Sequence, residues 1–137
     1  MKRRVTVFCI ALFVALMLAA SASAAKGSIG TQNLLITNWG TSIGKAGYRT
    51  VNISGYTQSA YPVDSLSVRV YLQWWNGFQW IDITNRYAVN LNSSYVEGYW
   101  DIPVSKSGEY RTRAVHTADD GALNDTQYST SPSVFLE

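Results

Sequence analysis

Apolar and polar residues alternate in short runs along most of the chain, and clusters of Gly, Asn, Asp, Ser and Pro separate these runs. Alternation with a period of two indicates half-buried β-strands, and no stretch after Ala25 has the period of an amphipathic helix. The pattern therefore predicts a single all-β domain folded as an antiparallel β-sandwich. The seven predicted strands are Thr31–Ile36, Thr50–Tyr56, Leu66–Trp75, Phe78–Thr84, Tyr95–Ile102, Tyr110–His116 and Gln127–Leu136.

The clearest predicted element is a hairpin in the middle of the chain. Aliphatic residues occupy every second position from Leu66 to Leu72, so one face of this strand is expected to be buried. Asn76-Gly77 then gives the strongest short signal for a two-residue type I′ turn, in which both positions require positive φ. Such a turn pairs Trp75 with Phe78 and fixes the register of the hairpin. The resulting aliphatic pairs on the core side are Leu72 with Ile81 and Val70 with Ile83.

The segment Gly108–Ala114 predicts the strand that follows a corner of the sandwich. In immunoglobulin-like sandwiches, a Tyr near the start of this strand donates a hydrogen bond to backbone upstream, and Tyr110 is suited to that role. Thr112 and Ala114 are then expected to face the core, with the arginines beside them facing outward. These features favour an immunoglobulin-like or fibronectin-like antiparallel sandwich of about seven strands. Pro132 predicts an edge position or a bulge in the last strand, since it has no backbone N–H.

The N-terminus has the three parts of a secretory signal peptide. Met1–Arg4 is cationic, Val5–Ala20 carries no charge, and Ala22-Ser23-Ala24 matches the A-x-A cleavage pattern. The apolar run of 16 residues is shorter than the roughly 20 that span a bilayer, which favours cleavage over an uncleaved anchor. We therefore expect a signal peptide at 1–24, a β-sandwich domain at 25–137 without a membrane span, and a protein that is secreted or loosely associated with the cell surface.

Charge and cysteine content further narrow the class of protein to which the chain can belong. The chain has 11 Lys plus Arg and 9 Asp plus Glu, a formal charge of +2. Three of the basic residues lie in the predicted signal peptide, which leaves eight against nine, a net charge of −1. This balance does not suit a nucleic-acid-binding domain. The single Cys, Cys9, also lies in that segment, so the mature domain is expected to be disulfide-free, which fits an exported bacterial domain.

Candidate catalytic and metal-ligating residues are few. His116 is the only His, and no G-x-S-x-G motif is present to supply an activated nucleophile. The acidic residues form no recognisable glycosidase pair, and one His without a mature Cys argues against zinc. The segment Asp119–Asp125 could offer oxygen ligands to Ca²⁺, but its pattern is incomplete and an ordinary hairpin turn is favoured. We expect a non-enzymatic protein without catalytic residues, metal or cofactor, and a His116 that is packed or at a rim.

One constellation points to binding. The predicted hairpin register places aromatic side chains on the face opposite the aliphatic core residues, and the strand Tyr110–His116 is expected beside Leu66–Trp75, which adds two arginines. Aromatic and Arg side chains exposed together are typical of interfaces and of sugar-stacking platforms. The alternative is a covering layer in which the Arg stems lie on the rings. The candidate ligand- or partner-binding residues are Arg69, Tyr71, Trp75, Phe78, Trp80, Arg111 and Arg113.

The same segments carry a resemblance to a known family. The motifs are Tyr71–Gly77, Trp80–Ile83 and Gly108-x-Tyr110-Arg111-x-Arg113-x-x-His116. They resemble a family of small secreted β-sandwich proteins of Gram-positive spore-forming bacteria, catalogued as a domain of unknown function. The resemblance implies a secreted single-domain sandwich with no assigned activity and carries over no catalytic residues.

Together these observations predict a secreted, non-catalytic interaction module that binds a partner or associates with itself. The expected partners are a cell-wall glycan, a surface protein or another copy of the chain, and nucleic acid is not expected. The alternative is a secreted antimicrobial or toxin-like protein that acts on membranes, although the sequence has no cationic amphipathic segment after Ala25 to support it.

Overall fold

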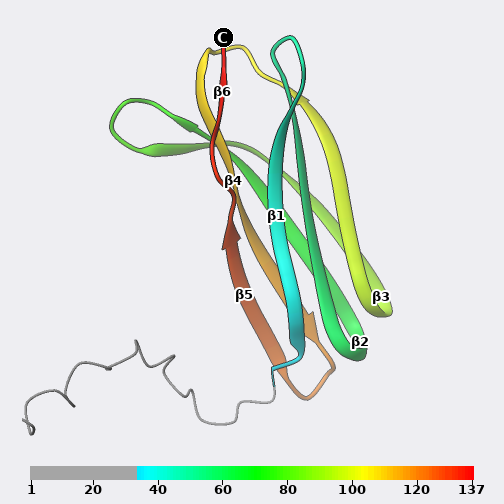
Figure 1. The fold of residues 1–137 in the computed structure, drawn as a ribbon. Helices are drawn as coiled ribbons and strands as arrows, with labels where there is room; N and C mark the ends of the chain where they lie inside the picture. Colours follow the sequence, from blue (N-terminus) through cyan, green and yellow to red (C-terminus); the bar gives the residue numbers. More distant parts are fainter. Residues whose placement is uncertain (1–33) are drawn as a thin grey trace, which may run out of the picture. The chain divides into compact units, whose positions relative to one another are not determined.

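β-Strands dominate residues 34–137, the part of the chain that the computed structural model describes (Figure 1). The strands are β1 (Ile36–Gly47), β2 (Thr50–Trp75), β3 (Trp80–Pro103), β4 (Gly108–Asp119), β5 (Asn124–Thr130) and β6 (Val134–Leu136). This confirms the all-β prediction for the described part. Leu34–Glu137 form one compact unit. The predicted signal peptide at 1–24 and most of the predicted strand Thr31–Ile36 lie outside the described residues.

The six strands form one antiparallel sheet that curls back on itself, because β2 and β3 bend. The ladder between β2 and β3 is interrupted after Gln58 and resumes at Val63. Before the bend β2 pairs with β1, and after it with β4. The two halves of β2 face one another, since a Cβ at Gly55 would lie 2.6 Å from a Val70 methyl. Thr57 Oγ1 also donates to the Ser67 carbonyl across the same interface, at 3.0 Å.

The curl gives two layers, which we call the β1 layer and the β4 layer. The β1 layer holds β1, the first half of β2 and the second half of β3. The β4 layer holds the first half of β3, the second half of β2, then β4, which pairs with both β5 and β6. The predicted neighbours Leu66–Trp75 and Tyr110–His116 are adjacent, as expected. The loops and bends at the two ends of Figure 1 connect the layers.

The hydrophobic core lies between the layers. The alternation predicted for the second half of β2 is confirmed, since its aliphatic residues are fully buried. Val51 and Ile53 face them from the first half of β2. On β4, Thr112 and Ala114 are buried, while Arg111 and Arg113 are half-buried on the outside. The core residues from β2 after its bend are Leu66, Val68, Val70 and Leu72.

The predicted corner is also confirmed. Tyr110 is buried at the start of β4, and its hydroxyl donates to the Lys106 carbonyl at 2.5 Å, four residues upstream. Burial raises the pKa of Tyr110, so the phenol is a neutral donor at physiological pH. Pro132 is exposed between β5 and β6, where it divides the single strand predicted at Gln127–Leu136.

The predicted hairpin register is wrong. The loop spans four residues, 76–79, and Trp75 pairs with Trp80 instead of Phe78. The reason is local: Asn76 Oδ1 accepts hydrogen bonds from the backbone N–H of Phe78 at 2.8 Å and of Gln79 at 2.9 Å. This side-chain turn replaces the type I′ turn, and only the glycine of the pair keeps a positive φ.

The register change moves two residues out of the predicted core. Leu72 pairs with Thr84, and Val70 pairs with Arg86. A bulge between Asp82 and Thr84 leaves Ile83 without a partner in the ladder. Ile81 is 38% exposed and Ile83 48% exposed. The two isoleucines therefore line the surface of the hairpin and do not fill the core.

Strand β1 occupies a stretch that the alternation did not predict beyond Ile36. It is an edge strand that pairs with β2 alone. It also packs against β4 and β5, with few apolar side chains. Trp39 and Ile43 contact the core, and Trp39 Nε1 donates to the Tyr128 carbonyl at 3.1 Å. Asp125 accepts the backbone N–H of Ile36 at 2.9 Å, which anchors the start of the strand to β5. Gly, Ser, Thr and Asn fill most other positions of β1, so the period-two signal is weak.

We expect Gly77→Val to destabilise the protein by about 1 kcal/mol or more, because Gly77 has φ +98°, a region that β-branched residues resist. Gly44→Val is the matched control: its Cβ would meet nothing within 4 Å, and its φ lies outside the positive region. Urea unfolding of both variants measures the difference. Equal stability of the two variants would contradict a strained loop.

Candidate functional site

The outer face of the β4 layer gathers most of the residues proposed from the sequence. Tyr71 lies opposite Arg113 of β4, and Trp75 opposite Trp80 of β3. Alternate residues of a strand share one face, so the outward residues of the three neighbouring strands form a continuous surface. We call this surface the outer face. Its aromatic and charged members, together with Gln73, are Arg69, Tyr71, Gln73, Trp75, Trp80, Asp82, Tyr87, Arg111 and Arg113.

Each arginine of the outer face lies over an aromatic ring of another strand. The guanidinium carbon of Arg111 is 4.3 Å from the centre of the Trp80 ring. That of Arg113 is 4.4 Å from Tyr71, and that of Arg69 is 4.6 Å from Tyr87. Such cation–π contacts contribute about 0.5–1 kcal/mol each at exposed sites. The arginines thus partly cover the rings, as the covering-layer alternative expects.

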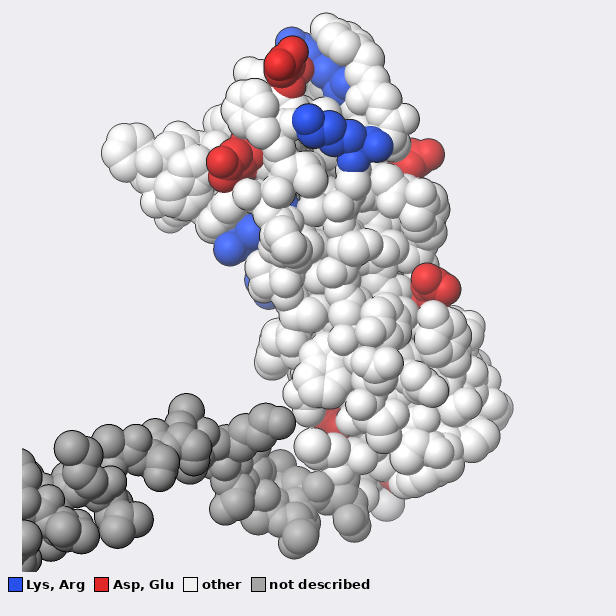
Figure 2. Space-filling view, viewed as in Figure 1, with Lys and Arg blue, Asp and Glu red and all other residues white. Residues whose placement is uncertain are grey.

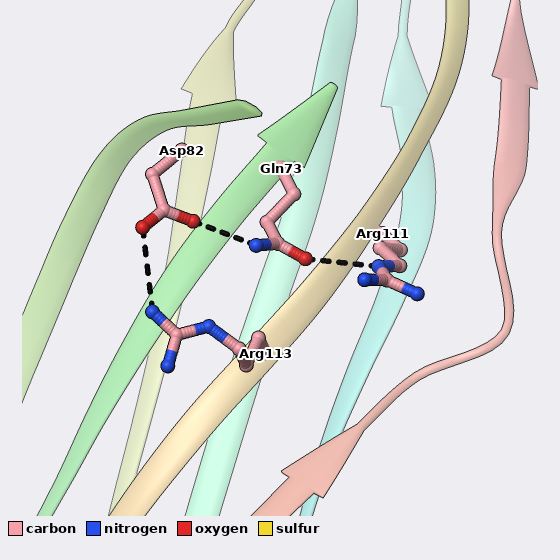
Figure 3. A network of polar contacts seen from close by, with 4 residues as sticks. All are labelled: Gln73, Asp82, Arg111 and Arg113. Carbon is pink, nitrogen blue, oxygen red and sulfur yellow. Dashed lines mark hydrogen bonds and ion pairs between the residues drawn. The ribbon is translucent and has the colours of Figure 1, made fainter. Parts of the chain in front are cut away.

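A polar network fixes the orientation of Arg111 and Arg113 (Figure 3). Gln73 donates through Nε2 to Asp82 Oδ1 at 2.7 Å and accepts from Arg111 Nε at 2.9 Å. Asp82 Oδ2 lies 3.3 Å from Arg113 Nη2 in an ion pair. Gln73 is buried, and both its amide nitrogen and its amide oxygen bond to other members of the outer face. The network therefore holds side chains of three strands in one arrangement.

Exposure divides the proposed residues into two groups. The three arginines, Tyr71 and Trp80 are half-buried by one another. Trp75 is 37% exposed and its ring lies 5.4 Å from that of Trp80, tilted by 53°. Phe78 is 89% exposed, but it lies in the hairpin loop and not on the outer face, which corrects its predicted position. The part of the surface most open to a partner is therefore the hairpin end.

Sequence reasoning missed three members of the outer face: Gln73, Asp82 and Tyr87. The predicted register did place Gln73 and Asp82 on the outer side of their strands, but residue type alone gave no reason to single them out. Tyr87 lay beyond the end of the predicted strand Phe78–Thr84. Extending the alternation past the bulge at Ile83 would have found it, because Tyr87 lies opposite Arg69.

A cleft of about 390 Å³ lies on the other side of the hairpin, between its end and the loop that joins β3 to β4. This volume is within the range of small-ligand sites. Lys106 Nζ stands 4.3 Å from the centre of the Trp74 ring, and Trp74 Nε1 donates to the Ser107 carbonyl at 3.2 Å. The exposed Ile81 and Ile83 line the same cleft. No sequence signal pointed to it, since its walls come from segments about 30 residues apart.

His116 is a buried structural residue, in agreement with the packed or rim histidine predicted. Its Nδ1 lies 2.8 Å from Thr57 Oγ1 and its Nε2 lies 2.7 Å from Ser129 Oγ. Because the Thr57 hydroxyl donates to the Ser67 carbonyl, its oxygen is free to accept from Nδ1–H. Burial lowers the pKa of His116 to about 4, so the ring is neutral at physiological pH. The histidine joins the two layers and is closed to substrate.

Asp119 and Asp120 serve the turn between β4 and β5, whereas Asp125 anchors the start of β1. Asp120 Oδ1 accepts the backbone N–H of Leu123 at 2.8 Å, and Oδ2 accepts the Tyr61 hydroxyl at 3.0 Å. These hydrogen bonds lower the pKa of Asp120. Within residues 34–137, no three His, Cys, Asp or Glu side chains converge as a metal site would require. The same residues include no helix long and apolar enough to cross a membrane.

Comparison with known proteins assigns no family to this chain. No family model matches the chain, and no curated protein matches it. Among solved structures, the chain is similar to a family 76 glycoside hydrolase from a bovine Bacteroides thetaiotaomicron strain, with 12% sequence identity and a TM-score of 0.39. The match covers 73% of this chain and 20% of that one, so the chain spans about a fifth of the length of that structure.

Proposed function

We propose that the chain is a secreted, non-catalytic binding module of the immunoglobulin-like or fibronectin-like class, made from a precursor with a signal peptide at 1–24. The strand order of the two layers and the Tyr110 corner support the fold class. The A-x-A pattern at Ala22-Ser23-Ala24 supports export. Several hydrogen-bond donors and acceptors that a catalyst could use, such as His116 and Asp120, are engaged in structural bonds.

The observation that carries the proposal is a rigid platform of rings and polar groups that ends in exposed aromatic residues. Trp75 offers a ring beside Trp80, and Asp82 and Arg111, held in place by Gln73, supply carboxylate and guanidinium groups next to it. Saccharides bind to such combinations, because a sugar ring stacks on an aromatic face while its hydroxyls exchange hydrogen bonds with planar polar groups. A cell-wall glycan is therefore the partner class that this surface supports best.

Co-sedimentation with insoluble Gram-positive cell-wall glycan tests the proposal. We expect the chain from residue 25 onward to bind, and Trp75→Ala and Arg111→Ala each to weaken binding by about tenfold or more, as central interface residues do. Tyr48→Ala is the matched control, because Tyr48 is an exposed aromatic in the loop between β1 and β2, off the outer face. Equal retention of all four proteins, or no binding by the parent, would overturn the glycan assignment.

The exposed hairpin end favours a second candidate, the membrane-active protein. Phe78 is exposed at the tip, and Trp75, Ile81 and Ile83 are exposed behind it, on a hairpin that extends away from the layers (Figure 1). Apolar tips of this kind can enter the interface of a bilayer. Dye release from phosphatidylglycerol vesicles by the parent, lost in Phe78→Ser, would support this activity. Absence of release by the parent would exclude it for that lipid.

A further inference from the structure

Strand β3 is a free edge of the sheet in both layers. Its backbone pairs with β2 alone, so within residues 34–137 no strand lies on its other side. It runs for 24 residues. An unpaired edge presents a row of backbone N–H and C=O groups, to which another strand can add.

The stretch Thr84–Asn92 of this edge lacks the usual protection. Edges are normally protected by Lys, Pro, bulges or shortness, whereas this stretch carries no Lys or Pro and a single charge, Arg86. It begins after the bulge at Ile83 and ends at Asn92, whose φ is 50°. Exposed apolar side chains stand along it at every second position: Tyr87, Val89 and Leu91.

Few charges lie at this stretch: Arg86 lies in it, and Arg69 of β2 lies beside it, with its guanidinium carbon 4.6 Å from the centre of the Tyr87 ring. On the face shown in Figure 2, Lys and Arg gather in the upper part of the described unit, away from the bends of β2 and β3. Little electrostatic repulsion therefore opposes a second apolar strand at this edge. Such an exposed, mainly apolar edge strand with a single charge marks an association site.

We propose that Thr84–Asn92 pairs with the same stretch of a second copy of this chain, antiparallel about a two-fold axis at Ala88. A strand edge is complementary to itself in this arrangement, because the two-fold axis forms every cross-strand pair twice, once on either side of the axis. Ala88 is the middle residue of the unprotected stretch, so this centre gives the longest ladder between the bulge and Asn92.

The pairs that this register creates favour a second copy as the occupant. Tyr87 of each copy lies opposite Val89 of the other, an aromatic and β-branched combination that stabilises antiparallel sheets. Arg86 lies opposite Asn90, so like charges do not meet at the axis. Ala88 at the axis has a side chain small enough for two copies to approach closely.

Pairing at β3 joins the two β4 layers into one sheet, with both outer faces on the same side. If the outer face binds a glycan as proposed above, the dimer holds two sites for one repeating polymer, which raises avidity. The dimer itself does not depend on the glycan, since it uses the backbone edge and not the rings.

Sedimentation equilibrium over a wide concentration range tests the dimer, on the chain from residue 25 onward, which retains the whole compact unit. We expect the parent to approach twice its monomer mass, and Val89→Lys to raise the dimer dissociation constant by about tenfold or more. Thr126→Lys is the matched control, because Thr126 is exposed on β5, the other edge strand of the β4 layer. A monomeric parent, or a Val89→Lys protein that dimerises as the parent does, would overturn the proposal.

A cysteine at the axis gives a second test that does not require the lysine variant to fold. The sequence has Cys9 alone, so the chain from residue 25 carries no other thiol. Opposed residues of an antiparallel pair are close enough for a disulfide. Ala88→Cys should therefore form a covalent dimer on mild oxidation, whereas Thr126→Cys should not. Equal cross-linking of both variants, or none of Ala88→Cys, refutes the two-fold axis at Ala88. Glycan co-sedimentation of the same proteins reports separately on the outer face.

Discussion

Leu72→Ala is expected to lower the free energy of unfolding by about 2–5 kcal/mol, the range for deleting a buried Leu side chain in a core that relaxes only partly. Leu72 is fully buried on the inner face of β2, between the two layers of the sheet. Its partner Thr84 on β3 is shorter than the predicted Ile81, so little side-chain volume is available beside it to fill the cavity. Urea unfolding monitored by far-UV circular dichroism measures the change.

Trp80→Ala is the matched comparison from the opposite face of the same sheet. Trp80 is larger than Leu72, but it is half-buried and contacts Arg111 and Trp75 on the outside. Losing those contacts should cost about 1 kcal/mol. If Trp80→Ala destabilised the protein as much as Leu72→Ala, the outer face would be part of the stabilising core and not a surface open to a partner.

Acidification is expected to destabilise the protein by about 3 kcal/mol through His116 alone. Burial lowers the pKa of His116 to about 4 in the folded protein, from 6.5 for an exposed histidine. Between these two values the unfolded chain binds a proton that the folded protein does not. The contribution of neutral His116 is therefore complete above about pH 6.5, is lost as the pH falls, and is exhausted near pH 4.

The pH dependence of stability between pH 7 and 4, compared between the parent and His116→Gln, checks this prediction. The glutamine variant has no titrating group at this position, so its stability should vary less across the window, whatever its absolute value at neutral pH. An unchanged slope would show that His116 is accessible to protons in the folded protein.

The sequence alone determined which face of each central strand is buried. From Leu66 to Leu72 and from Tyr110 to Ala114, alternate residues differ in polarity, and the pleat of a strand sends alternate side chains to opposite faces. The buried positions of Leu72 and Ala114 and the outward arginines follow from this period. The corner at Tyr110 was equally predictable, because its hydrogen bond joins two residues that are only four apart in the sequence.

The candidate site was predicted in part for the same reason. Arg69, Tyr71 and Trp75 alternate with core residues along one strand, so they had to share its outer side. The arginines of β4 joined them because the strand order of a sandwich makes β2 and β4 neighbours. Phe78 was misplaced because its position depended on the loop, and Asn76 accepts two backbone N–H groups there to make a four-residue turn.

Tertiary structure decided the rest, because strand neighbours, registers and bends depend on segments far apart in sequence. The pattern of one strand does not say which residue of another lies opposite, and the bulge at Ile83 changes the partners of everything beyond it. The bends of β2 and β3 bring Gly55 against Val70 and close the core. His116 bonds Thr57 only because those bends stack the layers, whereas its other partner, Ser129, lies on the adjacent strand β5. Periodicity fixed the inside and outside of each strand, and packing between distant strands fixed which side chains meet.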